Sequence, residues 1–138
     1  MYWTQAVDGR SRNTSPDWLF DIAENAIPPD QRFGDNPAVE MILSPVAVVE
    51  PRGEWLRSPN ALLVTQSQLV FAYKRGLGRR GVVHNWFRDD FSKYGVGLYL
   101  GAGPLFACSA IHDSRGLFQF LFGSKTEADA LGEYFANG

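Results

Sequence analysis

The sequence has very little of what builds disulfide scaffolds, metal centres and membrane spans. Among its 138 residues are one cysteine, Cys108, and two histidines, His84 and His112. A single cysteine cannot form an internal disulfide, so a reducing compartment is the simpler expectation. No apolar run approaches the roughly 20 residues that a membrane-spanning helix needs, and residues 1–12 have no apolar core typical of a secretory signal. We therefore expect a cytoplasmic protein.

A large excess of charge of either sign is also absent. The chain has 13 lysine and arginine residues against 15 aspartate and glutamate residues, which gives a net charge of −2. This balance provides no general attraction for nucleic acid, and no RNP-type motif is present, so we expect no nucleic-acid partner. Apolar residues are plentiful, since 45% of the chain is hydrophobic and 14% is aromatic. This composition and length predict one globular domain over residues 1–138.

The start of the chain predicts an arm and one helix. Residues 1–14 are polar and mixed in composition, which is typical of a loose arm. Ser15-Pro16-Asp17 indicates a helix start, because serine caps a helix, proline fits its first position and aspartate suits its positive end. Pro28-Pro29 would end this helix, which we place over residues 15–27.

The middle of the chain predicts strands. We expect a loop over residues 30–40, and then a strand over residues 41–50 in which Pro45 marks an edge or a bulge. Residues 52–60 read as a polar loop that includes Trp55. Short apolar segments separated by turns then bring the total to about seven strands. The clearest segments are Ala61–Thr65, Leu69–Lys74, Gly81–Phe87, a stretch around Val96, Leu98 and Leu100, Leu105–Ile111, and Leu117–Phe122.

The end of the chain predicts a helix that packs on these strands. Ser124-Lys125-Thr126-Glu127 is a capping box, which satisfies two backbone donors at a helix start. Apolar residues follow at helical spacing, and alternate phenylalanines in the last strand are expected beneath them. The residues are Ala128, Leu131, Tyr134 and Phe135 in the helix and Phe118, Phe120 and Phe122 in the strand.

This order of elements resembles that of the pleckstrin-homology-like (PH-like) barrel, in which seven short strands precede one amphipathic helix. The stretch Ala-Leu-Leu-Val-Thr-Gln-Ser-Gln-Leu-Val-Phe-Ala-Tyr-Lys (61–74) looks like the hairpin of bacterial PH-like and GRAM-like domains, and residues 116–135 resemble their ending. The resemblance covers residues 40–136. It implies a mainly β (α+β) fold, a seven-stranded antiparallel barrel or sandwich capped by the C-terminal helix, with the N-terminal helix added. It does not imply one function, because such a barrel supports many unrelated tasks.

Basic residues gather in three of the predicted loops. The resemblance would place these loops together at the open end of the barrel, where guanidinium groups could bind a phosphate bidentately. Trp55 and Leu77 would be apolar tips at the same end. The simpler alternative is that these are ordinary solvated side chains on polar loops. The candidate residues for an anionic group are Arg52, Arg57, Lys74, Arg75, Arg79, Arg80 and Arg115.

No pattern predicts catalysis, a cofactor or a metal site. Gly76-Leu77-Gly78-Arg79-Arg80-Gly81 matches the G-x-G-x-x-G pattern of a dinucleotide-binding loop. A predicted strand follows it, however, instead of the helix that would hold the pyrophosphate. A hairpin turn is the better interpretation. Cys108 lies in an apolar strand, where a free cysteine acts as a small hydrophobe. Asp89-Asp90 predicts a charged turn, because adjacent side chains point in different directions. We therefore expect a non-enzymatic protein.

These observations favour an interaction or adaptor module that binds a protein partner, for example through the unpaired backbone of an outer strand. One alternative is recognition of an anionic lipid or another phosphate ligand by the basic loops, with peripheral contact to an anionic membrane. A second alternative is a small-molecule site or an enzyme inside a half-open barrel. Self-association into a homo-oligomer is also left open.

Overall fold

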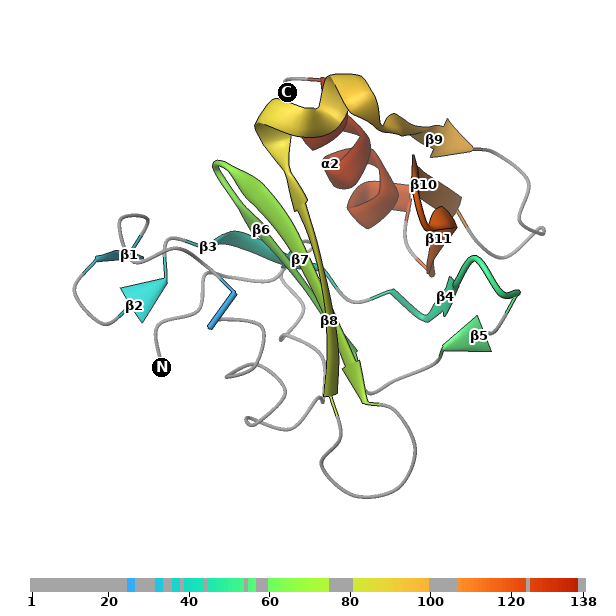
Figure 1. The fold of residues 1–138 in the computed structure, drawn as a ribbon, viewed down its shortest axis with the longest axis horizontal. Coiled ribbons are helices and arrows are strands. Elements are labelled where there is room, and N and C mark those ends of the chain that lie inside the picture. The colour runs from blue at the N-terminus through green and yellow to red at the C-terminus, as the bar shows by residue number, and fades with distance from the viewer. Residues whose placement is uncertain are drawn as a thin grey trace. The chain divides into compact units, whose positions relative to one another are not determined.

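The computed structural model describes residues 25–26, 32–33, 36–37, 39–43, 45–53, 55–56, 60–74, 81–99, 107–123 and 125–136. They form mainly antiparallel β-sheets, with one helix near the C-terminus (Figure 1). The chain divides into two compact units: unit 1 is Met1–Ser44 with Ser58–Arg88, and unit 2 is Pro45–Arg57 with Asp89–Gly138. The expected arm over 1–14 and nearly all of the expected helix over 15–27 lie outside the described residues. The single domain expected from the sequence stays a prediction.

Unit 1 contains a four-stranded antiparallel sheet with the order β3-β6-β7-β8, and Figure 1 shows β6, β7 and β8 side by side. The pairing of β7 with β8 is regular over seven residues, whereas a register shift interrupts the pairing of β3 with β6 between Val39 and Met41. A separate ribbon pairs β1 with β2. The strands are β1 (Arg32–Phe33), β2 (Asn36–Pro37), β3 (Val39–Leu43), β6 (Asn60–Thr65), β7 (Gln68–Lys74) and β8 (Gly81–Phe87).

Thr65 holds the turn between β6 and β7. Its hydroxyl accepts hydrogen bonds from the backbone N–H groups of Ser67 at 3.3 Å and Gln68 at 3.0 Å. The same hydroxyl donates to the carbonyl oxygen of Gln68 at 3.1 Å. One side chain therefore satisfies three backbone groups at a tight polar turn, which lies where the sequence predicted it.

Strands β6 and β7 are buried on both faces. Every residue from Asn60 to Thr65 and from Gln68 to Tyr73 is buried. Successive side chains of a strand point to opposite faces, so burial without alternation means that both faces are covered. The nearly continuous apolar sequence of these strands matches this arrangement.

Unit 2 contains a five-stranded antiparallel sheet with the order β5-β4-β11-β10-β9. Strands β10 and β11 form a hairpin whose two-residue turn, Ser114–Arg115, lies between the paired residues Asp113 and Gly116. A 3₁₀-helix, η3 (Arg88–Lys93), precedes β9. The strands are β4 (Ala47–Val49), β5 (Trp55–Leu56), β9 (Gly95–Tyr99), β10 (Ala107–Asp113) and β11 (Gly116–Phe122).

Helix α2 (Lys125–Ala136) packs on this sheet, where it contacts β9, β10 and β11. The hydroxyl of Ser109 in β10 donates to the carbonyl oxygen of Ala128 at 3.3 Å, and Ser109 is paired with Phe120 across the hairpin. The helix-facing side of β11 is therefore the side that bears its alternate phenylalanines. The predicted helix and its core are confirmed, since all of the expected residues are buried: Phe118, Phe120, Phe122, Ala128, Leu131, Tyr134 and Phe135.

Four local predictions are wrong. Residues 30–40 are not a loop throughout, because β1, β2 and the start of β3 lie there. Residues 41–50 do not form one strand, because β3 and β4 belong to different sheets and Pro45, which has no N–H for a ladder, lies between them. Trp55 lies in the short strand β5, not in a loop. Residues 88–90 open η3 and are not a simple turn, and in that helix Lys93 forms an exposed ion pair with Asp90 at 3.1 Å.

Both of the larger sheets are open as far as the described strands show. The sheet of unit 1 ends in β3 and β8, and the sheet of unit 2 ends in β5 and β9. The mainly β fold with a C-terminal helix is confirmed, whereas the PH-like barrel stays a prediction. In the part of the chain that is described, no helix has the length and apolar character needed to cross a membrane.

Candidate functional site

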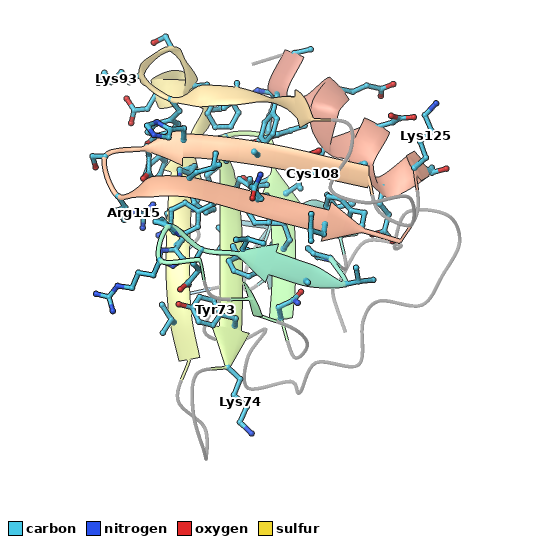
Figure 2. All side chains as sticks on the ribbon, turned by 90° about the vertical axis from the view of Figure 1, so that its right-hand side faces the viewer. Tyr73, Lys74, Lys93, Cys108, Arg115 and Lys125 are labelled. Carbon is cyan, nitrogen blue, oxygen red and sulfur yellow. The ribbon has the colours of Figure 1, made fainter. Side chains whose placement is uncertain are left out.

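The predicted anion-binding residues are divided between the two units. Lys74 lies at the end of β7 in unit 1, and Arg52 and Arg115 lie in exposed turns of unit 2 (Lys74 and Arg115 are labelled in Figure 2). The backbone of Trp55 lies in β5, but its side chain is not among those described. The other predicted positions lie outside the described residues: Arg57, Arg75, Leu77, Arg79 and Arg80. Two of the predicted anion-binding residues, Arg52 and Arg115, are described within one unit, so their relative position can be compared only in unit 2.

The turns of Arg52 and Arg115 are neighbours. Pro51 precedes Arg52 in the turn after β4, and Gly116 follows Arg115 at the start of β11. A Cβ atom built on Gly116 would lie 2.6 Å from the Cβ atom of Pro51, and Gly116 has a φ of +124°. Only glycine fits both the close approach and this backbone conformation. Two of the three basic turns that the sequence singled out thus lie side by side.

Arg115 is already paired within its own turn. Its Nη2 donates to Oδ2 of Asp113 at 2.7 Å, its Nε donates to the same oxygen at 3.1 Å, and its backbone N–H donates to Oδ1 at 2.7 Å. The guanidinium carbon also lies 5.1 Å from the centre of the Phe118 ring. These contacts orient the guanidinium and compensate its charge. The turn therefore offers a phosphate less positive charge than the sequence alone suggests.

Residues that could act in catalysis lie apart in unit 2. Cys108 is buried in β10, and burial raises the pKa of its thiol, which disfavours the thiolate that a nucleophile needs. His112 lies four residues further along the same strand, or ~13 Å at the usual rise of a strand, which is too far for proton transfer. Among the described residues, no group of three or more histidine, cysteine, aspartate or glutamate side chains is placed to hold a metal ion.

The outer side of β8 presents backbone groups in a regular array. The N–H of Arg88 donates to the carbonyl oxygen of Ser67 at 2.8 Å, which continues the pairing of β8 with β7 by one residue. In an antiparallel ladder, residues that bond to the partner alternate with residues that point away from it. Val82, His84 and Trp86 therefore bond toward β7. The N–H and C=O groups that point away belong to Gly81, Val83, Asn85 and Phe87, and we call these four residues the β8 edge.

The β8 edge lacks the features that usually protect an edge strand. Such strands are blunted by charged residues, proline, bulges or short length. In the described sheets, β3 has a register shift between Val39 and Met41, β5 has two residues, and β9 has five residues. Strand β8 has seven residues, no lysine, arginine, aspartate or glutamate, no proline and no register shift. It is the longest and most regular of the four edges.

Neighbouring side chains contact β8 and the adjacent strand β7 on both faces of the sheet. The rings of Tyr73 and His84 lie 5.8 Å apart, and those of His84 and Trp86 lie 5.9 Å apart. On the other face of the sheet, Nε2 of Gln68 donates to Oδ1 of Asn85 at 3.4 Å and to the carbonyl oxygen of Ala26 at 3.0 Å. A strand fixed on both faces pays little conformational entropy when another strand pairs with it.

The sequence predicted an outer-strand docking edge without identifying the strand. The available signal was the uncharged run Gly81–Phe87, which stands between Arg80 and Arg88. That run shows a strand, but only the sheet order shows that it is an edge. Comparison with known proteins found no match to this chain among family models, curated proteins or solved structures.

Proposed function

We propose that this chain is a non-enzymatic interaction module of PH-like fold whose β8 edge accepts an extended segment of a protein partner. The fold part of the proposal is supported by the order of the long strands, with β6 to β8 consecutive in one sheet, β9 to β11 consecutive in the other, and α2 after them. The observation that carries the function is the unprotected β8 edge. A regular row of outward N–H and C=O groups is the feature that strand addition requires.

Binding at the β8 edge would work through the backbone. Each of its four residues has one N–H and one C=O that point away from β7, and an added strand would pair with these groups. Main-chain hydrogen bonds would supply much of the affinity, and side chains next to the edge would supply specificity. The exposed ring of Phe87, with 42% of its surface accessible, is the largest apolar side chain of the edge.

The test compares two substitutions at Val83, the outward residue near the middle of the strand. Val83→Pro removes the outward N–H donor while the hydrogen bonds to β7 remain, and edge strands tolerate proline at such positions. Val83→Ala keeps the donor and is the matched control. In quantitative affinity capture from the native cell, we expect partners that are retained by the wild type and by Val83→Ala and are lost by Val83→Pro.

Amide hydrogen exchange gives the direct readout of the proposed contact. The amides of Val83, Asn85 and Phe87 should exchange quickly in the dilute, monomeric protein and slowly once a captured partner is added, because the added strand would accept their hydrogen bonds. If partners bind all three proteins equally and the three amides stay unprotected, the proposed function is wrong.

Binding of an anionic ligand is a second candidate function, because the turns of Arg52 and Arg115 lie side by side. The pairing of Arg115 with Asp113 weighs against it. Co-sedimentation with neutral and acidic vesicles at low and physiological salt tests it. Pelleting with acidic vesicles alone, which weakens with salt and is lost in Arg52→Glu/Arg115→Glu, would favour this candidate over the β8 edge. Pelleting that is absent at both salt concentrations would eliminate it.

A further inference from the structure

We infer that the strand that pairs with the β8 edge is β8 of a second copy of this chain, in antiparallel orientation. This inference rests on the proposed function, since it names the partner of the same edge. It places the two strands about a two-fold axis through His84 and joins two four-stranded sheets into one continuous sheet.

The first support is the spacing of the outward residues. Gly81, Val83, Asn85 and Phe87 are distributed symmetrically about His84, so an antiparallel copy centred there brings outward residues only against outward residues. Val83 then faces Asn85 of the second copy, and Gly81 faces Phe87 of the second copy. Every outward N–H and C=O of the edge finds a partner in this register. A two-fold arrangement of this kind is the commonest closed symmetry of protein dimers.

The second support is the pairing of Phe87 with glycine. Phe87 is exposed, with 42% of its surface accessible, and it is one of two large hydrophobic residues described as exposed. In the symmetric register it stands opposite Gly81, which has no side chain, so the phenylalanine ring can lie across the glycine backbone. Aromatic residues opposite glycine stabilise strand pairs in this way. Two such pairs, one at each end, would cover the exposed ring of each copy.

The third support is the absence of charge. The strand from Gly81 to Phe87 contains no lysine, arginine, aspartate or glutamate, and the whole chain has a net charge of only −2. Like charges directly opposite each other destabilise a strand pair, and an identical strand would repeat any charge that it carried. A neutral strand avoids that repulsion.

The mass of the protein in solution tests the inference. In sedimentation equilibrium, the wild type and Val83→Ala should show a reversible, concentration-dependent rise from 15.4 kDa toward twice that mass. Val83→Pro should weaken the dimer by about tenfold or more, because two backbone hydrogen bonds are lost for each dimer. A wild type that stays at 15.4 kDa at every concentration up to the millimolar range would overturn the inference, as would a dimer that Val83→Pro leaves unchanged.

The register has a separate test that uses two cysteine variants. His84 meets its own counterpart on the two-fold axis as a non-hydrogen-bonded pair, with Cα atoms ~4.5 Å apart, a separation that a disulfide can bridge. His84→Cys should therefore form a covalent dimer under mild oxidation. Val82→Cys is the matched control, since residue 82 faces residue 86 of the second copy and lies far from its own counterpart. The native Cys108 is buried and present in both variants. Equal cross-linking of both variants, or more in Val82→Cys, would show that the register is wrong.

The two proposals can fail separately. A monomeric wild type whose partners are nevertheless lost in Val83→Pro would refute the second copy and leave the proposed function in place. A monomer that captures the same proteins with and without Val83→Pro would refute both. A dimer that depends on Val83 supports the inference whether or not other proteins are captured.

Discussion

The sheets of the two units differ in what protects them. In unit 1, β6 and β7 are covered on both faces, yet the sheet ends in the long, uncharged strand β8. In unit 2, helix α2 packs on the sheet, and the edges are a two-residue strand and a five-residue strand. Covering a sheet's faces and protecting its edges are thus separate tasks. Among the described strands, unit 1 ends in the longest regular edge, and this difference is the reason for placing the docking site on β8.

Polar side chains connect neighbouring elements in both units. In unit 2 they connect neighbouring elements, as when Ser109 of β10 bonds to Ala128 of α2. In unit 1 the side chain of Thr65 stabilises a turn, and Gln68 and Asn85 bond across neighbouring strands. None of these bonds in unit 1 uses the outward backbone groups of the β8 edge. Among the described residues, these side chains therefore contact β8 without bonding to its outward backbone groups.

The largest effect is expected from truncation of the core of unit 1. Phe71 is fully buried in β7, and its ring lies 5.4 Å from that of Tyr73. Phe71→Ala should lower the free energy of unfolding by about 3–5 kcal/mol, because it removes a large apolar side chain and leaves a cavity. Phe120→Ala is the matched variant in unit 2 and should cost a similar amount. Urea unfolding measures both losses.

The same pair of variants tests the single-domain prediction. If the chain is one cooperative domain, each variant should show one unfolding transition, and amide exchange should rise in both sheets together. Separate transitions, in which Phe71→Ala affects only β6 to β8 and Phe120→Ala affects only β9 to β11, would show two independent domains.

Gly116 should be the most sensitive position among the turns. Gly116→Ala should lower the free energy of unfolding by about 2–4 kcal/mol, because it combines an unfavourable φ with a collision against Pro51. Gly53→Ala is the control, since Gly53 also has a positive φ, +81°, but no atom lies within 4 Å of a Cβ built there. Its loss should be about 1–2 kcal/mol. Equal losses at the two glycines in thermal unfolding would mean that the contact between the two turns does not stabilise unit 2.

Removal of the Thr65 hydroxyl should have a smaller effect, in unit 1. Thr65→Val keeps the β-branched shape but leaves three backbone groups of the β6–β7 turn without their partner. We expect a loss of about 1–3 kcal/mol in urea unfolding. Thr65→Ser keeps the hydroxyl and should restore most of the stability. A serine variant as unstable as the valine variant would show that packing, and not hydrogen bonding, holds this turn.

The smallest expected effect is a loss of stability of unit 2 at high pH. The pKa of the Cys108 thiol is raised from its usual value of 9.0 by burial. The pKa of Tyr94 is raised from 10.0, first by burial and then by the carboxylates of Asp90 and Asp113. Because the folded state favours the protonated forms, their contribution is fully present below pH 9. It is lost as the pH rises through the folded pKa values.

Urea unfolding between pH 8 and pH 11 checks this expectation. The free energy of unfolding should fall with pH by at most about 1.4 kcal/mol per pH unit for each group. Cys108→Ala and Tyr94→Phe should each reduce that slope, whatever their effect at pH 8. A slope that neither variant changes would mean that other groups control the alkaline behaviour.

The strands and the C-terminal helix could be predicted because their patterns are local. Gly81–Phe87 is a strand with the predicted bounds, and the stripe from Ala128 to Phe135 is the buried side of α2. The separation of β3 from β4 could not be predicted, since an apolar segment does not show which sheet it joins. Pro45 was visible, but a proline within a strand also fits a bulge.

The candidate site was less accessible to prediction than the fold. Arg115 was recognised as a basic loop residue, but its pairing with Asp113 two positions earlier depends on the shape of the turn. Identifying the β8 edge requires the sheet order and the residues of β8 that bond to β7. Neither can be predicted from the local sequence. The sequence shows which side chains carry charge. The conformation of the turn determines that Asp113 pairs with Arg115, and the sheet order determines which backbone N–H and C=O groups of β8 point outward.

The pairing of β4 with β11 has a consequence for how the chain is made. Val49 pairs with Gln119, 70 residues further along, whereas the pairs β6–β7 and β7–β8 each join strands that are adjacent in sequence. During synthesis, the hairpins of unit 1 can form as soon as they leave the ribosome, while β4 must wait for the last strand. The β8 edge therefore exists on the nascent chain before unit 2 is complete. Neighbouring chains on one messenger RNA could then meet through it.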